Sequence, residues 1–426
     1  MVTFFMLIGL FALVLINVPI AIALAVVTSV AMVVAQGTDI LPNMALVMMD
    51  GATKFPLIAI PLFILAGAIM NTSGISRRLI AFASAILGFI RGGLAMVNIG
   101  ASMFFAEISG SAVADVAALG SILIPAMKKR GYPLAFATAV TSSSASLAVI
   151  IPPSIPMILY AVMAQSSVVE LFVAGIIPGI LGGFGMMGVS YWFARRYNYP
   201  VEEVFQLKRV AQTFKEAALA LTLPIIILGG IFGGFVTATE GAGLAVVAAL
   251  LIGLVYRELD LKALVQAMID GGIQTAVVML LVAASVLIGQ YLTEVQVPQT
   301  IAQGIIEFTQ NKYVILAILN VFLLVVGLFL HSAAAIILVV PIVMPLVQAA
   351  GIDPVHFGIV VTLNLGIGQQ TPPVASVLVT ACSVAKADIW EVSKVNIYFI
   401  GVLFAVLMLV TYVPAVPMFL VELFYR

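Results

Sequence analysis

The chain has very little charge. Only 8% of its 426 residues are Asp, Glu, Lys or Arg, and 63% are hydrophobic, whereas soluble domains carry roughly 25% charged residues. The 18 basic and 18 acidic residues cancel, so nothing in the composition indicates a nucleic-acid partner. A single cysteine, Cys382, excludes an internal disulfide framework and a cysteine metal cluster. Apolar runs longer than about 18 residues recur instead, which predicts an all-α polytopic protein in a lipid bilayer.

Missing motifs disfavour several activities. No G-x-x-x-x-G-K-[ST] loop is present, so an ATP-driven pump is not expected. Neither His331 nor His356 lies in an H-E-x-x-H motif, which argues against an intramembrane metalloprotease. An intramembrane hydrolase could pair only Ser109 or Ser111 with His331. That hydrolase and a passive anion channel remain as alternatives to a transporter.

The chain also repeats itself at a constant offset. Pro152-Pro153 returns 220 residues later as Pro372-Pro373. We expect two like-built halves, 1–206 and 221–426, joined at 207–220 by an amphipathic linker helix at the membrane interface. Duplicated halves with helix breaks at matching positions are typical of secondary transporters.

In each half, the sequence predicts a re-entrant hairpin followed by a broken helix. The hairpins span about 98–130 and 318–350, the broken helices about 132–163 and 352–385, and the other first-half spans lie near 2–35, 56–71, 79–97 and 168–195. A polar Ser-Gly-Ser turn at mid-membrane is tolerated only where it is buried in protein or lines an aqueous cavity. Five crossings plus one hairpin give an odd count, which predicts an inverted repeat. The Lys and Arg distribution places the N-terminus outside.

The segments before the two proline pairs predict cation sites. Proline lacks an N–H and clashes with the preceding helical turn, so carbonyls just before Pro152 and Pro372 lose their helical partners. A serine-rich stretch at 142–146 precedes the first break, and Asn364 to Thr371 bring amides and hydroxyls to the second. Such oxygens suit sodium. Helix N-termini at the hairpin tips favour a carboxylate, so the sequence predicts cation-coupled transport of an organic anion.

Several motifs together are highly specific. They are Glu107–Asp115, Gly131-Tyr132, Ile151 to Pro156, Leu171–Gly179 and Thr371-Pro372-Pro373-Val374. In this combination the chain resembles, over essentially its whole length, the large membrane subunit of tripartite ATP-independent periplasmic (TRAP) transporters. The resemblance implies an elevator-type, non-enzymatic transporter of the bacterial inner membrane, in which an outside N-terminus would lie in the periplasm. It also implies Na⁺ as coupling ion without other cofactors, a small four-span membrane subunit, a periplasmic substrate-binding protein and a small organic acid.

The resemblance further implies which residues form the sites. Sodium would be held by Ser109, Ser111, Ser144 and Ile150 in the first half and by Gly327, Asn364, Thr371 and Pro372 in the second. The substrate would lie between the hairpin tips, at Ser111, Asp115, Ser154 and Ser332. Two positions depart from the family pattern: His331 stands where an acidic residue is common, and Ala375 where glycine often follows the Thr-Pro-Pro-Val signature. Asp115 and His331 could each be functional or structural.

Overall fold

The computed structural model describes residues 2–16, 18–109, 111–201 and 205–426, without the side chains of 107–109 and of part of the first helix. Within these ranges the secondary structure is helical throughout, with no strand. Eight of the described helices are long and apolar enough to cross a membrane. The predicted all-α membrane architecture is therefore confirmed.

The helices of the first half are short except for the last. They are α1 (Val2–Leu15), α2 (Ile20–Gln36), α3 (Leu41–Ala52), α4 (Ala59–Thr72), α5 (Ile75–Leu87), α6 (Gly93–Ser109), α7 (Ala112–Lys129), α8 (Leu134–Ala145), α9 (Ile155–Ala164) and α10 (Val168–Arg196). There are also three 3₁₀ turns. The turn η1 (Thr38–Ile40) precedes α3, η2 (Phe55–Ile58) precedes α4, and η3 (Ser146–Val149) extends α8.

The second half contains ten helices among the described residues. They are α11 (Leu207–Phe232), α12 (Ala238–Tyr256), α13 (Leu261–Glu294), α14 (Val297–Phe308), α15 (Lys312–Phe329), α16 (Ser332–Ala349), α17 (Pro354–Gly368), α18 (Ser376–Ala385), α19 (Ile389–Tyr412) and α20 (Ala415–Tyr425). A shift of 220 residues carries α7 onto α16 at both ends. The same shift brings α6, α8, α9 and α10 onto α15, α17, α18 and α19. The order of elements is thus duplicated, while the inversion of the second copy stays a prediction.

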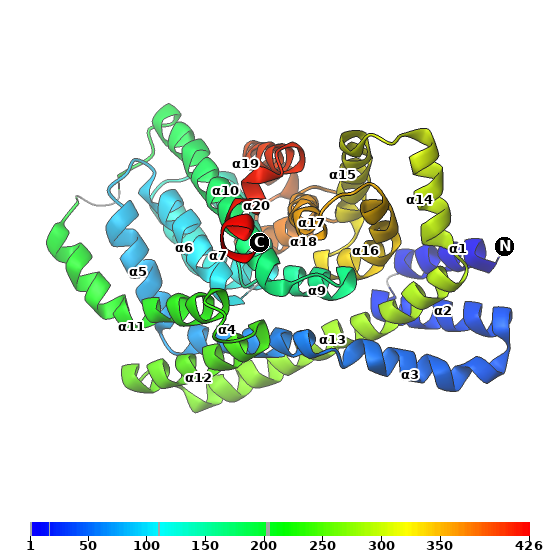
Figure 1. Ribbon diagram of the computed structural model, residues 1–426. Coiled ribbons are helices and arrows are strands. Elements are labelled where there is room, and N and C mark those ends of the chain that lie inside the picture. Colours follow the sequence, from blue (N-terminus) through cyan, green and yellow to red (C-terminus); the bar gives the residue numbers. More distant parts are fainter. Residues whose placement is uncertain (1, 17, 110, 202–204) are drawn as a thin grey trace.

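The helices form two layers. In Figure 1 the long α13 runs along the lower edge beside α2, α3 and α4, with α12 at one end. The two helix pairs α6–α7 and α15–α16 and the broken helices lie above this layer, together with α10, α19 and α20. Each broken helix packs against elements of the other half: α9 contacts α16, and α18 contacts α7. The interrupted segments therefore lie at the centre of the bundle.

Side-chain caps fix several helix starts. Asp353 and Asp388 each accept two backbone N–H groups at the starts of α17 and α19. At α12, Thr237 and Glu240 form a reciprocal capping box. Because the first N–H groups of a helix have no intrahelical partner, such caps determine where a helix begins. The carboxylate of Glu240 is occupied in this way as a cap.

Three boundaries differ from the sequence-based expectation. The segment 2–35, expected as one span, contains two helices, α1 and α2, and Pro19 stands at the N-cap of α2 because it cannot extend α1 as a helix. The segment 79–97 is interrupted between α5 and α6, where Gly92 adopts a positive φ. The predicted linker helix at 207–220 continues without a break into α11 and packs on α5. Its Phe214 ring lies 5.7 Å from that of Phe82.

Two ion-pair clusters connect residues that are distant in sequence. Glu258 accepts hydrogen bonds from Arg77 and Arg78 at 2.8 and 2.9 Å. Arg426 donates to Glu170 at 2.7 Å and to Asp353 at 2.6 Å, so it joins the start of α10 in the first half to the start of α17 in the second. Burial raises the pKa of Asp353, but hydrogen bonds from Arg426 and from backbone N–H groups outweigh it and hold that pKa below its usual value.

Replacing Arg426 with alanine should lower the free energy of unfolding at neutral pH by about 0.2–1 kcal/mol, because the guanidinium is partly exposed and solvent screens the pairs. Since the pKa of Asp353 is depressed, its contribution is present above the ordinary pKa of about 3.9 and is lost as the pH falls through the folded value. Thermal unfolding in detergent at pH 7 and pH 3 measures the stability difference between wild type and the variant. Arg91→Ala, at an exposed arginine, is the control, and a difference that does not shrink in acid would contradict the assignment.

Candidate functional site

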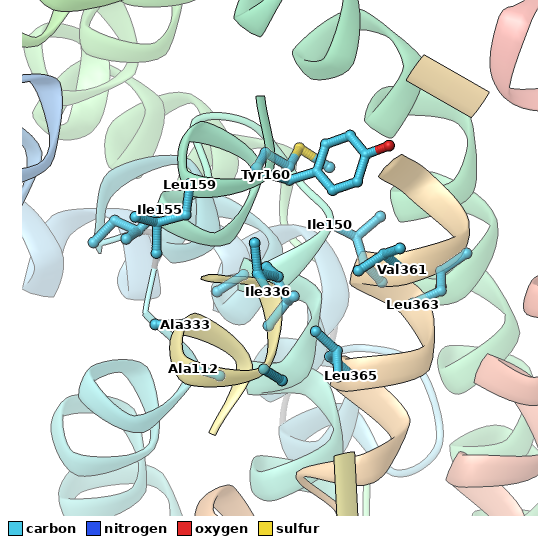
Figure 2. Close-up of a cluster of buried hydrophobic side chains, with 14 of the residues drawn as sticks. Ala112, Ile150, Ile155, Leu159, Tyr160, Ala333, Ile336, Val361, Leu363 and Leu365 are labelled. Atoms are coloured by element: carbon cyan, nitrogen blue, oxygen red, sulfur yellow. The ribbon is translucent and has the colours of Figure 1, made fainter. Parts of the chain in front are cut away.

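The two helix-pair tips lie at one cavity. Ser111 is the N-cap of α7 and His331 is the N-cap of α16, so both helices begin at equivalent points of the repeat. Both residues line a cavity of about 640 Å³, together with Ser332. Figure 2 shows Ala112 and Ala333, the residues beside the two tips, together with Ile155 from α9, which lines the same cavity. The residues at the two tips therefore line one shared cavity.

The cavity is mostly apolar and contains few polar groups. Besides the tip residues Ser111, His331 and Ser332, its polar lining side chains are Gln274 of α13 and Gln369 after α17. No Lys, Arg, Asp or Glu is among the lining residues described. An anion in this cavity would therefore be met by hydroxyls, amides and the N–H groups at the starts of α7 and α16, which favour negative charge.

His331 contributes to the cap of α16. Its Nδ1 accepts the backbone N–H of Ala333 at 3.4 Å. With Nδ1 used as an acceptor, the neutral ring carries its proton on Nε2. The histidine thus takes the capping role that Ser111 has in the first half, where the serine hydroxyl accepts the N–H of Ala114 at 3.5 Å.

Two of the predicted substrate residues lie behind the cavity wall. Asp115 is buried in the first turn of α7, where a carboxylate is favoured by the helix N-terminus. Ser154 is fully buried and donates to the carbonyl of Val149 at 2.8 Å. Its neighbours Val149, Ile155 and Pro156 line the cavity, whereas neither Asp115 nor Ser154 is among the lining residues.

The first broken helix presents buried hydroxyls to α6. Ser144 lies 2.8 Å, Oγ to Oγ, from Ser102. One turn earlier, Asn98 donates to Thr141 at 2.6 Å, and the Asn98 Oδ1 has no hydrogen-bond partner among the described residues. Ser144 was among the predicted sodium ligands, whereas Ser102 and Asn98 were not. The only signal for those two was that they are isolated polar residues on an apolar helix, and Asn98 is fully buried.

At the first break, protein groups contact carbonyl oxygens that were predicted to bind a cation. The released carbonyl of Val149 accepts the Ser154 hydroxyl. The carbonyl oxygen of Ile150, a predicted sodium ligand, lies close against Gly175 of α10: a Cβ on that glycine would lie 2.3 Å from it. Ser109, another predicted ligand, ends α6, and its side chain lies outside the described part of the chain.

The second broken helix holds a buried amide oxygen without a partner. Asn364 donates from Nδ2 to Asn320 Oδ1 at 2.7 Å and to the Val360 carbonyl at 2.8 Å. Its Oδ1 is fully buried and has no hydrogen-bond partner among the described residues. Burying an unpaired amide oxygen costs about 1–3 kcal/mol, which a cation would offset. Asn364 is therefore the predicted ligand whose environment best fits sodium.

The other predicted ligands of the second half surround the same break. Gly327 and Gly368 bring α15 and α17 into backbone contact, because a Cβ on Gly368 would lie 2.5 Å from the Gly327 Cα. Thr371 donates to the Ile367 carbonyl at 3.0 Å, and Pro372 is half-buried. The Pro372-Pro373 bond is cis, as is Pro152-Pro153.

The oxygen groups at both breaks are uncharged. No cluster of three or more His, Cys, Asp or Glu side chains that could hold a metal is found in the described residues. Hydroxyl, amide and carbonyl oxygens are hard ligands that suit a hard cation rather than a transition metal. The residues present thus fit sodium.

Comparison with known proteins gives a consistent result. The family described as tripartite ATP-independent periplasmic transporter, DctM component, matches residues 7–416. The chain is 43% identical to the isethionate TRAP transporter permease protein DctMQ of Oleidesulfovibrio alaskensis, over 96% of this chain and 65% of that protein. It therefore spans just under two thirds of that relative's length. It is 38% identical to the C4-dicarboxylate TRAP transporter large permease protein DctM of Pseudomonas aeruginosa, over 89% of each chain.

Two further similarities are informative. The sialic acid TRAP transporter large permease protein SiaM of Vibrio cholerae is 37% identical over 88% of each chain. Among solved structures, the YdaH transporter of Alcanivorax borkumensis has a TM-score of 0.62 at 16% identity, over 92% of this chain and 96% of that one. At this identity the likeness concerns the fold alone.

Substituting Gly368 with alanine should destabilise the protein by about 1–3 kcal/mol, because the added methyl meets the Gly327 backbone, which cannot move as a side-chain end can. Thermal unfolding in detergent measures the effect as a lower midpoint. Gly401→Ala in α19 is the matched control, since a Cβ there meets nothing within 4 Å. Equal midpoints for the two variants would show that the contact between α15 and α17 is looser than described.

Proposed function

Because this chain belongs to the family of the DctM component of tripartite ATP-independent periplasmic transporters, we propose that it carries a small organic acid across the bacterial inner membrane, driven by sodium. The main observation in support is the fully buried Oδ1 of Asn364 beside the second helix break, which has no hydrogen-bond partner in the part of the chain that the structure describes. An intramembrane hydrolase is set aside, since the relatives are named transporter permeases. A passive anion channel is distinguished by experiment.

We assign one sodium site to each break. In the first half the ligands are Ser109, Ser111, Ser144 and Ile150, and the Ser102 hydroxyl beside Ser144 adds a further oxygen. In the second half they are Gly327, Asn364, Thr371 and Pro372. When bound, sodium supplies positive charge next to the cavity, and this charge favours an anion there. The protein's part is to hold these oxygens in place in a dry interior.

We assign the substrate to the cavity between the tips. Ser111 and Ser332 offer hydroxyls at its wall. Asp115, in the first turn of α7, and Ser154, which bonds the Val149 carbonyl at the first break, act from behind that wall. Backbone N–H groups at the starts of α7 and α16 suit a carboxylate or another small oxyanion. The named relatives carry isethionate, C4-dicarboxylates and sialic acid, and a compact acid of this kind is compatible with about 640 Å³.

We further propose an inverted repeat that works as an elevator. Contacts between the halves are reciprocal: α9 packs on α16 as α18 packs on α7, and α10 packs on α17 as α19 packs on α8. Reciprocity of this kind is expected around a two-fold axis. In addition, Ser146 and Gly366 are equivalent at the 220-residue offset, and a Cβ on Gly366 would lie 3.9 Å from the Ser146 carbonyl. This contact supports an axis passing near the two breaks.

The moving unit would then comprise the hairpins and broken helices, with α2–α5 and α11–α14 as scaffold. We propose that the N-terminus lies in the periplasm, because the Lys and Arg distribution favours that orientation. The partners are a small four-span membrane subunit and a periplasmic substrate-binding protein. Some relatives in this family combine two components in their names, as in DctMQ, whereas others are named as the large permease protein alone.

Uptake should require a sodium gradient. We expect proteoliposomes containing this chain and its small subunit, supplied with the loaded substrate-binding protein, to accumulate an organic acid when sodium is high outside. ATP alone should give no uptake. Accumulation that is unchanged when choline replaces sodium would contradict the proposal, and ion flux without delivered substrate would favour a channel.

Removing one hydroxyl from either break should weaken sodium binding. Ser144→Ala or Thr371→Ala is expected to raise the half-saturating sodium concentration about 5- to 30-fold, because one or two kcal/mol of binding free energy is lost. Sodium titration of uptake measures this. Ser121→Ala in α7 and Thr380→Ala in α18 are matched controls, since each removes a hydroxyl that bonds a helix carbonyl but belongs to neither proposed ligand set. Wild-type sodium dependence in both site variants would count against the assigned residues.

A further inference from the structure

Gln370 connects the two broken helices. It lies between the end of α17 and Pro372 and is fully buried. Its Nε2 donates to the Ser142 carbonyl at 2.8 Å and to the Ser146 hydroxyl at 2.6 Å. The Ser142 hydroxyl donates in return to Gln370 Oε1 at 2.7 Å. A side chain of the second half is thus bonded three times to the first break.

A third element completes this network. Asn396 of α19 donates from Nδ2 to Gln370 Oε1 at 3.1 Å and to the Gln370 carbonyl at 3.3 Å, and the Ser143 hydroxyl donates to Asn396 Oδ1. Gln370 Oε1 therefore accepts two hydrogen bonds and its Nε2 donates two, which is the full capacity of a primary amide. Fully satisfied buried networks of this kind are rigid and specify one arrangement.

The position of this amide relates it to both proposed sodium sites. Ser142 and Ser146 stand on either side of Ser144 in sequence, and Gln370 directly precedes Thr371. The connection has no counterpart in the repeat, because the residue 220 positions before Gln370 is Ile150. Among the described residues, the hydrogen bonds between the two breaks all involve Gln370, and no symmetric pair of such residues is found.

We propose that Gln370 is a positioning residue that couples the two sodium sites, an inference that rests on the proposed sodium-driven function. Sodium at the first break fixes the backbone around Ser142 and Ser146, and through the amide it fixes the segment that carries Thr371. The second ion then binds to a segment that is already ordered, so it loses less conformational entropy. By linkage the effect is reciprocal, and sodium activation should be cooperative.

The test is sodium titration of uptake by the Gln370→Met variant, which keeps a side chain of similar length and removes the amide. Wild type should show a Hill coefficient clearly above 1, with two sites as the upper bound. In the variant it should fall to about 1, with an apparent sodium affinity at least about fivefold weaker. Asn320→Leu is the matched control, because the side-chain bonds described for this buried amide go to Asn364 and Thr411 of its own half. It should weaken sodium binding and leave the cooperativity in place.

A variant that transports poorly is still informative, since sodium-dependent thermal stabilisation in detergent reports binding without transport. A purely structural role would lower the unfolding midpoint and the maximal rate without changing the Hill coefficient. Cooperativity that survives in Gln370→Met, or that is absent from wild type, overturns the coupling while sodium-driven transport stands. Wild-type uptake without any sodium dependence overturns both.

Discussion

The structure depends on one constraint: in the middle of an apolar bundle, two helices are interrupted by proline pairs, and every backbone group they release must find a partner inside the protein. Ser154 satisfies a carbonyl at the first break. At the second, the Gln369 carbonyl accepts the N–H of Val377 and, more weakly, that of Leu378 at the start of α18. Helices α7, α16, α10 and α19 surround these segments because the breaks must be enclosed.

The polar groups at the two breaks are uncharged. Hydroxyls and amides, including those of Ser144, Asn364 and Gln370, lie at the breaks, whereas the ion pairs of Glu258 and Arg426 lie at helix ends, partly exposed. Neutral oxygens can accept or release a monovalent ion at a modest desolvation cost. A permanent carboxylate there would bind such an ion more tightly and would need a countercharge whenever the ion left.

Much of this arrangement could be predicted from sequence, because punctuating residues are local signals. Pro152-Pro153 and Pro372-Pro373 located the breaks, and the tip serines indicated the new helix that begins after Ser111. The division of 2–35 into two helices and the continuity of α11 were missed, since apolar composition alone does not say where a span ends. The contacts of Ser102 with Ser144 and of Gln370 with Ser142 were also out of reach. They join residues 42 and 228 positions apart, and isolated polar residues in apolar helices carry no pattern that pairs them.

The long α13 shows where the two copies have diverged. At 1.5 Å per residue its 34 residues extend about 51 Å, well beyond a hydrocarbon core of about 30 Å, so it must be steeply inclined or project into the headgroups. Its counterpart in the first copy is divided into α3 and α4 by Thr53, Lys54 and η2. The second copy therefore contains one continuous, stiff helix, whereas the first contains two helices with a joint between them. Bending under load would concentrate at the joint, which makes the mechanical compliance of the two arms unequal.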